Sequence, residues 1–168
     1  TVSVSWGPEL FKPKKTDISK MIGSDASSFY CLRTLSSLFS DYEYTIEKYS
    51  KSKLSPDYIR ELKLPQIKGK KLSLEKIIYL KGSFLIFTSR YDNEEDKNFA
   101  YVEKRNASDG SIVTSLKEID YIVSFKKRNK GSFEFVVSKD SSKILIVHNE
   151  PYEKYSNEKF SYRLFDSD

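Results

Sequence analysis

The chain of 168 residues carries 29 Lys and Arg against 24 Asp and Glu, a formal net charge of +5. The two signs of charge are interleaved, so nucleic acid, which needs basic residues gathered on one element, is disfavoured as a partner. The chain's aromatic content of 14% is higher than that of disordered sequences and predicts a folded domain with a core rich in aromatic rings. The single cysteine excludes an intramolecular disulfide. The sequence contains no apolar span of 18 residues, so no membrane-crossing helix is predicted.

The first half of the chain alternates strand-like runs with turn residues. Residues 1–6 alternate Val and Trp with Ser, which predicts a separate N-terminal strand that ends at Gly7 and Pro8. Apolar runs at residues 29–32 and 42–47 predict two more strands. Residues 58–64 predict either a further strand or a helical turn, because the preceding Ser-Pro-Asp also fits a helix start.

The second half continues in the same way, with β-type runs separated by Gly- and Ser-containing turns. The turns Lys81-Gly82 and Ser108-Asp109-Gly110 suit positive backbone angles. Phe160, Tyr162 and Leu164 alternate with other residues, which is the period of a half-buried strand. The expected β runs are residues 74–80, 84–88, 99–104, 112–113, 119–123, 133–137, 144–147 and 160–165.

These runs recur at a regular spacing. The second strands of three units begin at residues 29, 84 and 144, which are 55 and 60 residues apart. The third strands of these units recur at similar spacings. A period near fifty residues with four short strands is typical of β-propeller blades. The repeat units are placed at residues 17–65, 72–123 and 131–168.

The turn of the last unit resembles the first hairpin of WD40-like and TolB-like propeller repeats, where Ser-Pro-Asp-Gly precedes a basic residue and an apolar strand. Ser138, Asp140 and Lys143 match that pattern, whereas Lys139 stands where Pro is usual and Ser141 where Gly is usual. The resemblance covers about a third of the chain. It implies an exported bacterial scaffold for partners and carries no catalytic residues to this sequence.

The predicted fold is therefore all-β, with antiparallel four-stranded blade-like repeats that form part of a β-propeller. Residues 1–168 are read as one β-repeat domain or a fragment of one, because closed propellers have four or more blades and this chain holds fewer than three. A β-sandwich or an open twisted sheet is the alternative.

Catalytic and metal sites are not predicted. His148 is the only histidine, which disfavours a His-based metal site or a Ser-His-Asp triad and indicates a histidine at the surface or at a hydrogen-bonded strand edge. The acidic loop at residues 92–96 lacks the spacing and the glycine of a calcium loop. No cofactor is expected.

The expected function is a non-enzymatic scaffold for protein–protein contacts, as an accessory subunit of a bacterial cell-envelope or secretion-associated complex. The start at Thr1, without Met, favours an exported, periplasmic or cell-surface protein that associates with a membrane complex. A glycan-binding or glycan-processing module is the alternative, since loop tyrosines bind both glycans and proteins. The candidate partner-binding residues are Tyr91, Tyr152, Tyr155, Lys126, Lys127 and Arg128.

Overall fold

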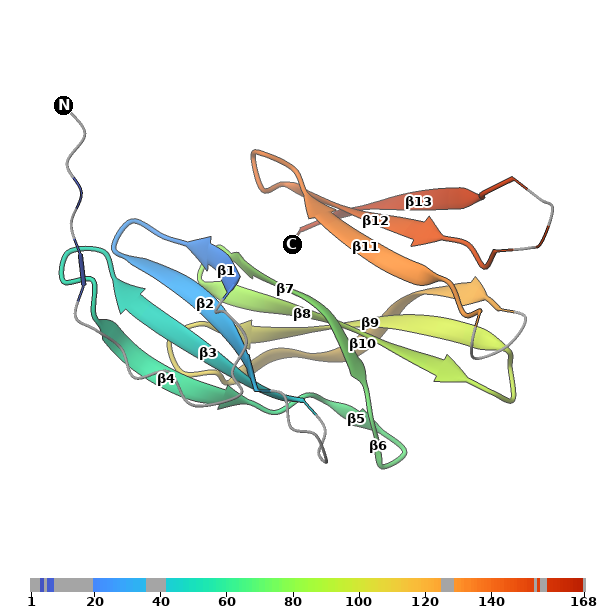
Figure 1. Ribbon diagram of the computed structural model, residues 1–168, viewed down its shortest axis with the longest axis horizontal. Coiled ribbons are helices and arrows are strands. Elements are labelled where there is room, and N and C mark those ends of the chain that lie inside the picture. Colours follow the sequence, from blue (N-terminus) through green and yellow to red (C-terminus); the bar gives the residue numbers. More distant parts are fainter. Residues whose placement is uncertain are drawn as a thin grey trace. The chain divides into compact units, whose positions relative to one another are not determined.

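A computed structural model describes residues 4, 6–7, 20–35, 42–124, 129–152, 154 and 157–167. In this part of the chain there are thirteen β-strands and no helix, and every strand pair is antiparallel (Figure 1). The chain forms two compact units, residues 1–64 and residues 65–168. Each unit is described by itself.

The first unit contains one four-stranded sheet in the order β1-β2-β3-β4. Its strands are β1 (Lys20–Ser24), β2 (Ser28–Leu35), β3 (Glu43–Ser50) and β4 (Pro56–Leu62). The segment that the sequence left open between strand and helix is thus a strand. Proline is tolerated there because Pro56 begins the strand at the edge of the sheet.

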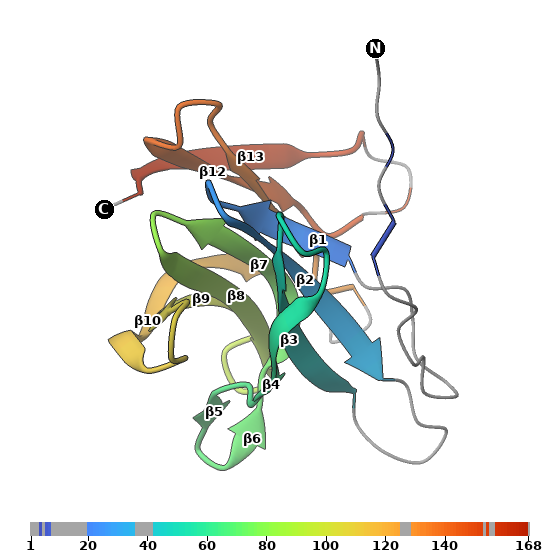
Figure 2. The ribbon, with the colours of Figure 1, turned by 90° about the vertical axis from the view of Figure 1, so that its left-hand side faces the viewer.

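The second unit contains a four-stranded sheet, a three-stranded sheet and a short hairpin, seen from two directions in Figures 1 and 2. The four-stranded sheet has the order β10-β9-β8-β7, and the three-stranded sheet has the order β11-β12-β13. Its strands are β5 (Gln66–Ile67), β6 (Lys70–Lys71), β7 (Ser73–Leu80), β8 (Ser83–Asp92), β9 (Lys97–Asn106), β10 (Ile112–Val123), β11 (Ser132–Val137), β12 (Lys143–Asn149) and β13 (Phe160–Asp166).

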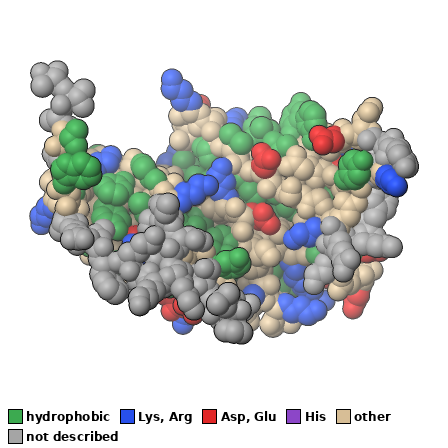
Figure 3. All heavy atoms as spheres, viewed as in Figure 1, with side chains coloured by type: hydrophobic (Ala, Val, Ile, Leu, Met, Phe, Trp, Pro, Cys, Tyr) green, Lys and Arg blue, Asp and Glu red, His purple; other side chains and the backbone are tan. Residues whose placement is uncertain are grey.

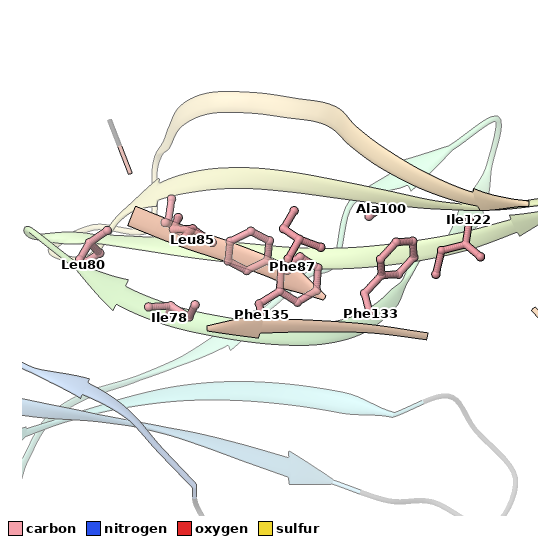
Figure 4. Close-up of a cluster of buried hydrophobic side chains, with 10 residues drawn as sticks. Ile78, Leu80, Leu85, Phe87, Ala100, Ile122, Phe133 and Phe135 are labelled. Carbon is pink, nitrogen blue, oxygen red and sulfur yellow. The ribbon is translucent and has the colours of Figure 1, made fainter. Parts of the chain in front are cut away.

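The core of the second unit lies between these two sheets. The rings of Phe87 on β8 and Phe135 on β11 stack with their centroids 4.2 Å apart (Figure 4). Ile122 on β10 and Ile146 on β12 are each 1% exposed in the same cluster. Alternate residues of each strand therefore face the opposite sheet, as in a β-sandwich.

The predicted all-β fold with antiparallel four-stranded sheets is confirmed. No closed propeller or barrel is present among the described residues, so the face-to-face packing in the second unit fits the sandwich alternative. The propeller repeat itself stays a prediction. Val4 and Trp6 are exposed and belong to no strand, and the rest of the predicted strand at residues 1–6 lies outside the described residues.

The turn that carries the family resemblance is held by its own side chains. Ser138 Oγ donates to Asp140 Oδ1 at 2.6 Å, and the backbone N–H of Lys143 donates to Ser138 Oγ at 2.9 Å. Hydrogen bonds from Ser138 and Ser142 lower the pKa of Asp140 to about 2. Ser141 has a φ of 60°, a left-handed angle that glycine adopts without strain.

Replacing Ser141 with glycine should therefore raise the free energy of unfolding by about 1 kcal/mol, because a non-glycine residue is strained in this region. Chemical denaturation of the purified chain measures the change. Glu61→Gly is the matched control within β4, where Glu61 is exposed and paired with Thr45, and where added backbone freedom should lower stability by about 0.5–1 kcal/mol. Equal losses in both variants would contradict the left-handed turn.

Candidate functional site

The three-stranded sheet has one face packed in the sandwich and one face turned away from it. The strand register places Val136 opposite Leu145, and Leu145 opposite Leu164. One step along, Val147 lies opposite Tyr162, and Phe160 follows at the end of the row. We call this surface the outer face; it comprises Val136, Leu145, Val147, Phe160, Tyr162 and Leu164.

The outer face is apolar and exposed along β13, while Glu134 and Asn149, joined by a hydrogen bond of 3.1 Å, lie on the same side of the sheet. Phe160 is 72% exposed, Tyr162 is 68% exposed and Leu164 is 60% exposed, and Val136 on the far strand is 48% exposed. Figure 3 shows hydrophobic side chains at the surface along β13. Contiguous exposed apolar side chains of this kind mark binding sites in folded proteins, whereas single ones are ordinary.

This face decides a question that the alternation in β13 left open. The sequence predicted a half-buried strand without indicating the buried face, and the structure turns Phe160, Tyr162 and Leu164 outward and places Ser161 and Arg163 on the opposite face. The register with β12 sets this choice, since Ser161 pairs with the inward-facing His148. A period of two fixes which residues share a face without fixing which face is buried.

The backbone of β13 also has an unpaired edge. At the two ends of β13, the N–H of Glu150 donates to the C=O of Lys159, and the N–H of Ser167 donates to the C=O of Ser142. Because the register between these two bonds is unbroken, they fix which residues of β13 bond to β12. Residues 161, 163 and 165 accordingly bond to β12, and residues 160, 162, 164 and 166 direct their N–H and C=O groups away from it. In the described part of the chain, β13 pairs with no strand other than β12.

The outer face continues into a surface hollow of about 260 Å³. Phe160 lines this hollow together with Tyr152, which is 61% exposed. Asn149, Glu150, Glu158 and Lys159 supply polar groups around the two rings. The hollow thus combines aromatic surface with hydrogen-bonding side chains.

The structure brings one of the predicted partner-binding residues to this surface. Tyr152 lies in the hollow, and its backbone N–H donates to Asn129 Oδ1 at 3.0 Å. Tyr91, at the end of β8, donates its hydroxyl to Asp96 Oδ1 at 2.6 Å, and this hydrogen bond raises the pKa of Tyr91. Four predicted residues lie outside the described residues: Lys126, Lys127, Arg128 and Tyr155.

A polar cluster lies on the inner side of the same sheet. His148, on the central strand, is 4% exposed, and its Nε2 lies 2.9 Å from Oδ2 of the buried Asp120 without the alignment of a hydrogen bond. Arg163 Nε lies 3.1 Å from the same oxygen. The expectation of a surface histidine is therefore wrong, although the histidine is hydrogen-bonded through its other nitrogen.

That other nitrogen, His148 Nδ1, lies 3.1 Å from Ser161 Oγ. Ser, His and Asp are thus neighbours in space, although the single histidine of the sequence disfavoured a Ser-His-Asp triad. In a hydrolytic triad, however, the hydroxyl meets Nε2 and the acid accepts from Nδ1. Here the nitrogens are exchanged, and Ser161 Oγ also donates to Glu150 at 3.0 Å. We interpret the cluster as polar packing within the sandwich.

Two further features are absent from the described ranges, a metal-binding cluster and a membrane-crossing helix. They contain no group of three or more His, Cys, Asp or Glu side chains placed to hold a metal ion. They also contain no helix long and apolar enough to cross a membrane.

Comparison with known proteins adds no identification. The chain matches no protein-family model, no curated protein and no solved structure.

The buried cluster predicts a stability difference between two aspartates. Asp120→Asn removes the anion beside His148 and Arg163, so the free energy of unfolding should fall by about 1–3 kcal/mol. Asp166→Asn is the control, because Asp166 is largely exposed and solvent screens its ion pair with Lys143, so stability should change little. Denaturant titration of both variants measures the difference, and an equal effect would show that the buried contacts contribute nothing.

Proposed function

We propose that this chain is a protein-binding domain whose outer face and β13 edge receive an extended segment of a protein partner. The single observation that carries this proposal is that Phe160, Tyr162 and Leu164 present exposed apolar side chains and outward-directed backbone groups together. A partner strand placed beside β13 would satisfy the backbone groups and extend the sheet.

The chemistry of the partner segment follows from the period of a strand. Its alternate residues must be apolar, because they would continue the row of Phe160, Tyr162 and Leu164 on the outer face. Its intervening residues would lie beside Ser161 and Arg163 on the other face, where polar side chains are favoured. Main-chain bonds would supply affinity and the alternate side chains specificity.

Membership of a bacterial cell-envelope or secretion-associated complex stays part of this proposal. It is supported by the sequence resemblance of the turn at residues 138–143 to exported propeller proteins. A scaffold role is consistent with a binding surface built from a sheet face and a strand edge, where contact area rather than catalysis is required.

Amide hydrogen exchange tests the edge directly. In the free chain, the amides of Tyr162 and Leu164 should exchange quickly, whereas those of Arg163 and Phe165 should be protected by β12. A photo-crosslinking residue at position 162 would identify the partner, and binding of that purified partner should then protect Tyr162 and Leu164. Unchanged exchange in the complex would contradict strand addition.

Two variants disrupt the proposed surface. Leu164→Lys should weaken partner binding at least about ten-fold by placing a charge in the apolar contact, and Tyr162→Pro should do so by removing both an outward N–H and the ring of the outer face. Ile59→Lys is the matched control, because Ile59 is 61% exposed on a strand of the first unit. Equal affinity of all three variants would contradict the proposed surface.

The hollow beside the outer face favours a glycan as the second candidate ligand. Tyr152 and Phe160 offer aromatic surface for a sugar ring, and Asn149, Glu150 and Glu158 offer hydrogen-bond partners for its hydroxyl groups. These groups suit glycan binding alone, and the proposal includes no glycan processing.

A glycan array with the purified chain, followed by titration of any sugar that binds, tests this candidate. Tyr152→Ala should weaken that binding about ten-fold or more, because the ring contact is lost. Tyr42→Ala is the control, since Tyr42 is 63% exposed in the first unit. The absence of any bound glycan, or equal losses in both variants, would remove the candidate.

A further inference from the structure

A second cavity lies inside the sandwich of the second unit, apart from the outer face. Its volume is about 260 Å³, and both sheets contribute to its walls. The walls are mostly apolar and include Leu85, Phe87, Val102, Ile144, Ile146 and Phe165. Binding sites for small molecules have this character, and those for drug-sized ligands span about 300–1,000 Å³, so a smaller ligand is indicated here.

Two lysines join these apolar walls. Lys104 lies two residues beyond Val102 on β9 and therefore shares its face, and Lys117 on β10 lies opposite Val102 in the strand register. Both side chains thus start from the face of the sheet that is turned toward the cavity. Within the described residues, neither lysine forms an ion pair.

The other polar groups that line the cavity do not neutralise the positive charge of Lys104 and Lys117. Asp166 is the acidic residue of the lining, and its carboxylate is paired with Lys143. Thr114 and Ser167 add hydroxyl groups without charge. An apolar space beside two lysines with no acidic partner is complementary to a molecule with an apolar tail and an anionic head.

We propose that this cavity binds a short fatty carboxylate, with its tail between the two sheets and its head at Lys104 and Lys117. The tail replaces water against apolar walls, and the head forms charge-assisted hydrogen bonds with the ammonium groups. The long lysine stems allow the ammonium groups to stay near solvent while their carbons cover the apolar wall. This proposal is independent of partner binding at the outer face.

Titration calorimetry with octanoate and octanol tests the proposal. Octanoate should bind the wild-type chain about ten-fold or more tightly than octanol, because only octanoate carries the anionic head. The double variant Lys104→Met/Lys117→Met should lose that preference, whereas Lys139→Met, which removes one charge from the exposed β11–β12 turn, should keep it. No binding of octanoate, or equal binding of octanol, would overturn the proposal.

A filled cavity gives a second test. Val102→Phe places a larger side chain in the wall and should abolish octanoate binding. Should that variant fail to fold, Lys104→Glu/Lys117→Glu replaces it and should bind octylammonium in preference to octanoate. Retained octanoate binding in the folded Val102→Phe variant, or an unchanged preference in the double Glu variant, would show that the ligand binds elsewhere.

Discussion

The packing of the two sheets in the second unit is the constraint on which the rest of that unit depends. Phe87 and Phe135 stack across the interface, and Ile122 and Ile146 are almost completely buried beside them. This contact fixes which face of β12 is inside. Because β13 follows β12 in register, the same contact turns Phe160 and Tyr162 outward and Phe165 inward.

The packing of the two sheets therefore produces three features of the second unit. The inner side of the three-stranded sheet contributes apolar walls to the cavity and holds the His148 cluster, and the outer side becomes an exposed apolar surface. A polar cluster of this kind contributes little net stability compared with apolar packing, but removing Asp120 or His148 leaves the other one buried without its charged neighbour. The cluster thus favours one register of β13 over a shift that would separate Ser161 from His148.

Much of the strand pattern could be predicted from the sequence, because alternation and turn residues are local signals. The turns at Lys81-Gly82 and Ser108-Asp109-Gly110 are examples, with positive φ at Lys81, Gly82 and Gly110. The candidate site was predicted only at Tyr152. The orientation of β13 depends on its register with β12, and the burial of His148 places it beside Asp120, 28 positions away in sequence, so no local pattern reports them.

The open edge of β13 has a consequence for the free chain. Natural sheets guard such edges with charged side chains, proline or a bulge, and β13 has no proline and no bulge, so its guard consists of the charges of Arg163 and Asp166. Two molecules that meet edge to edge can therefore associate into ribbons at high concentration. Edge-to-edge pairing of two copies would use the same outward N–H and C=O groups of residues 160, 162, 164 and 166, so self-association would hide the edge.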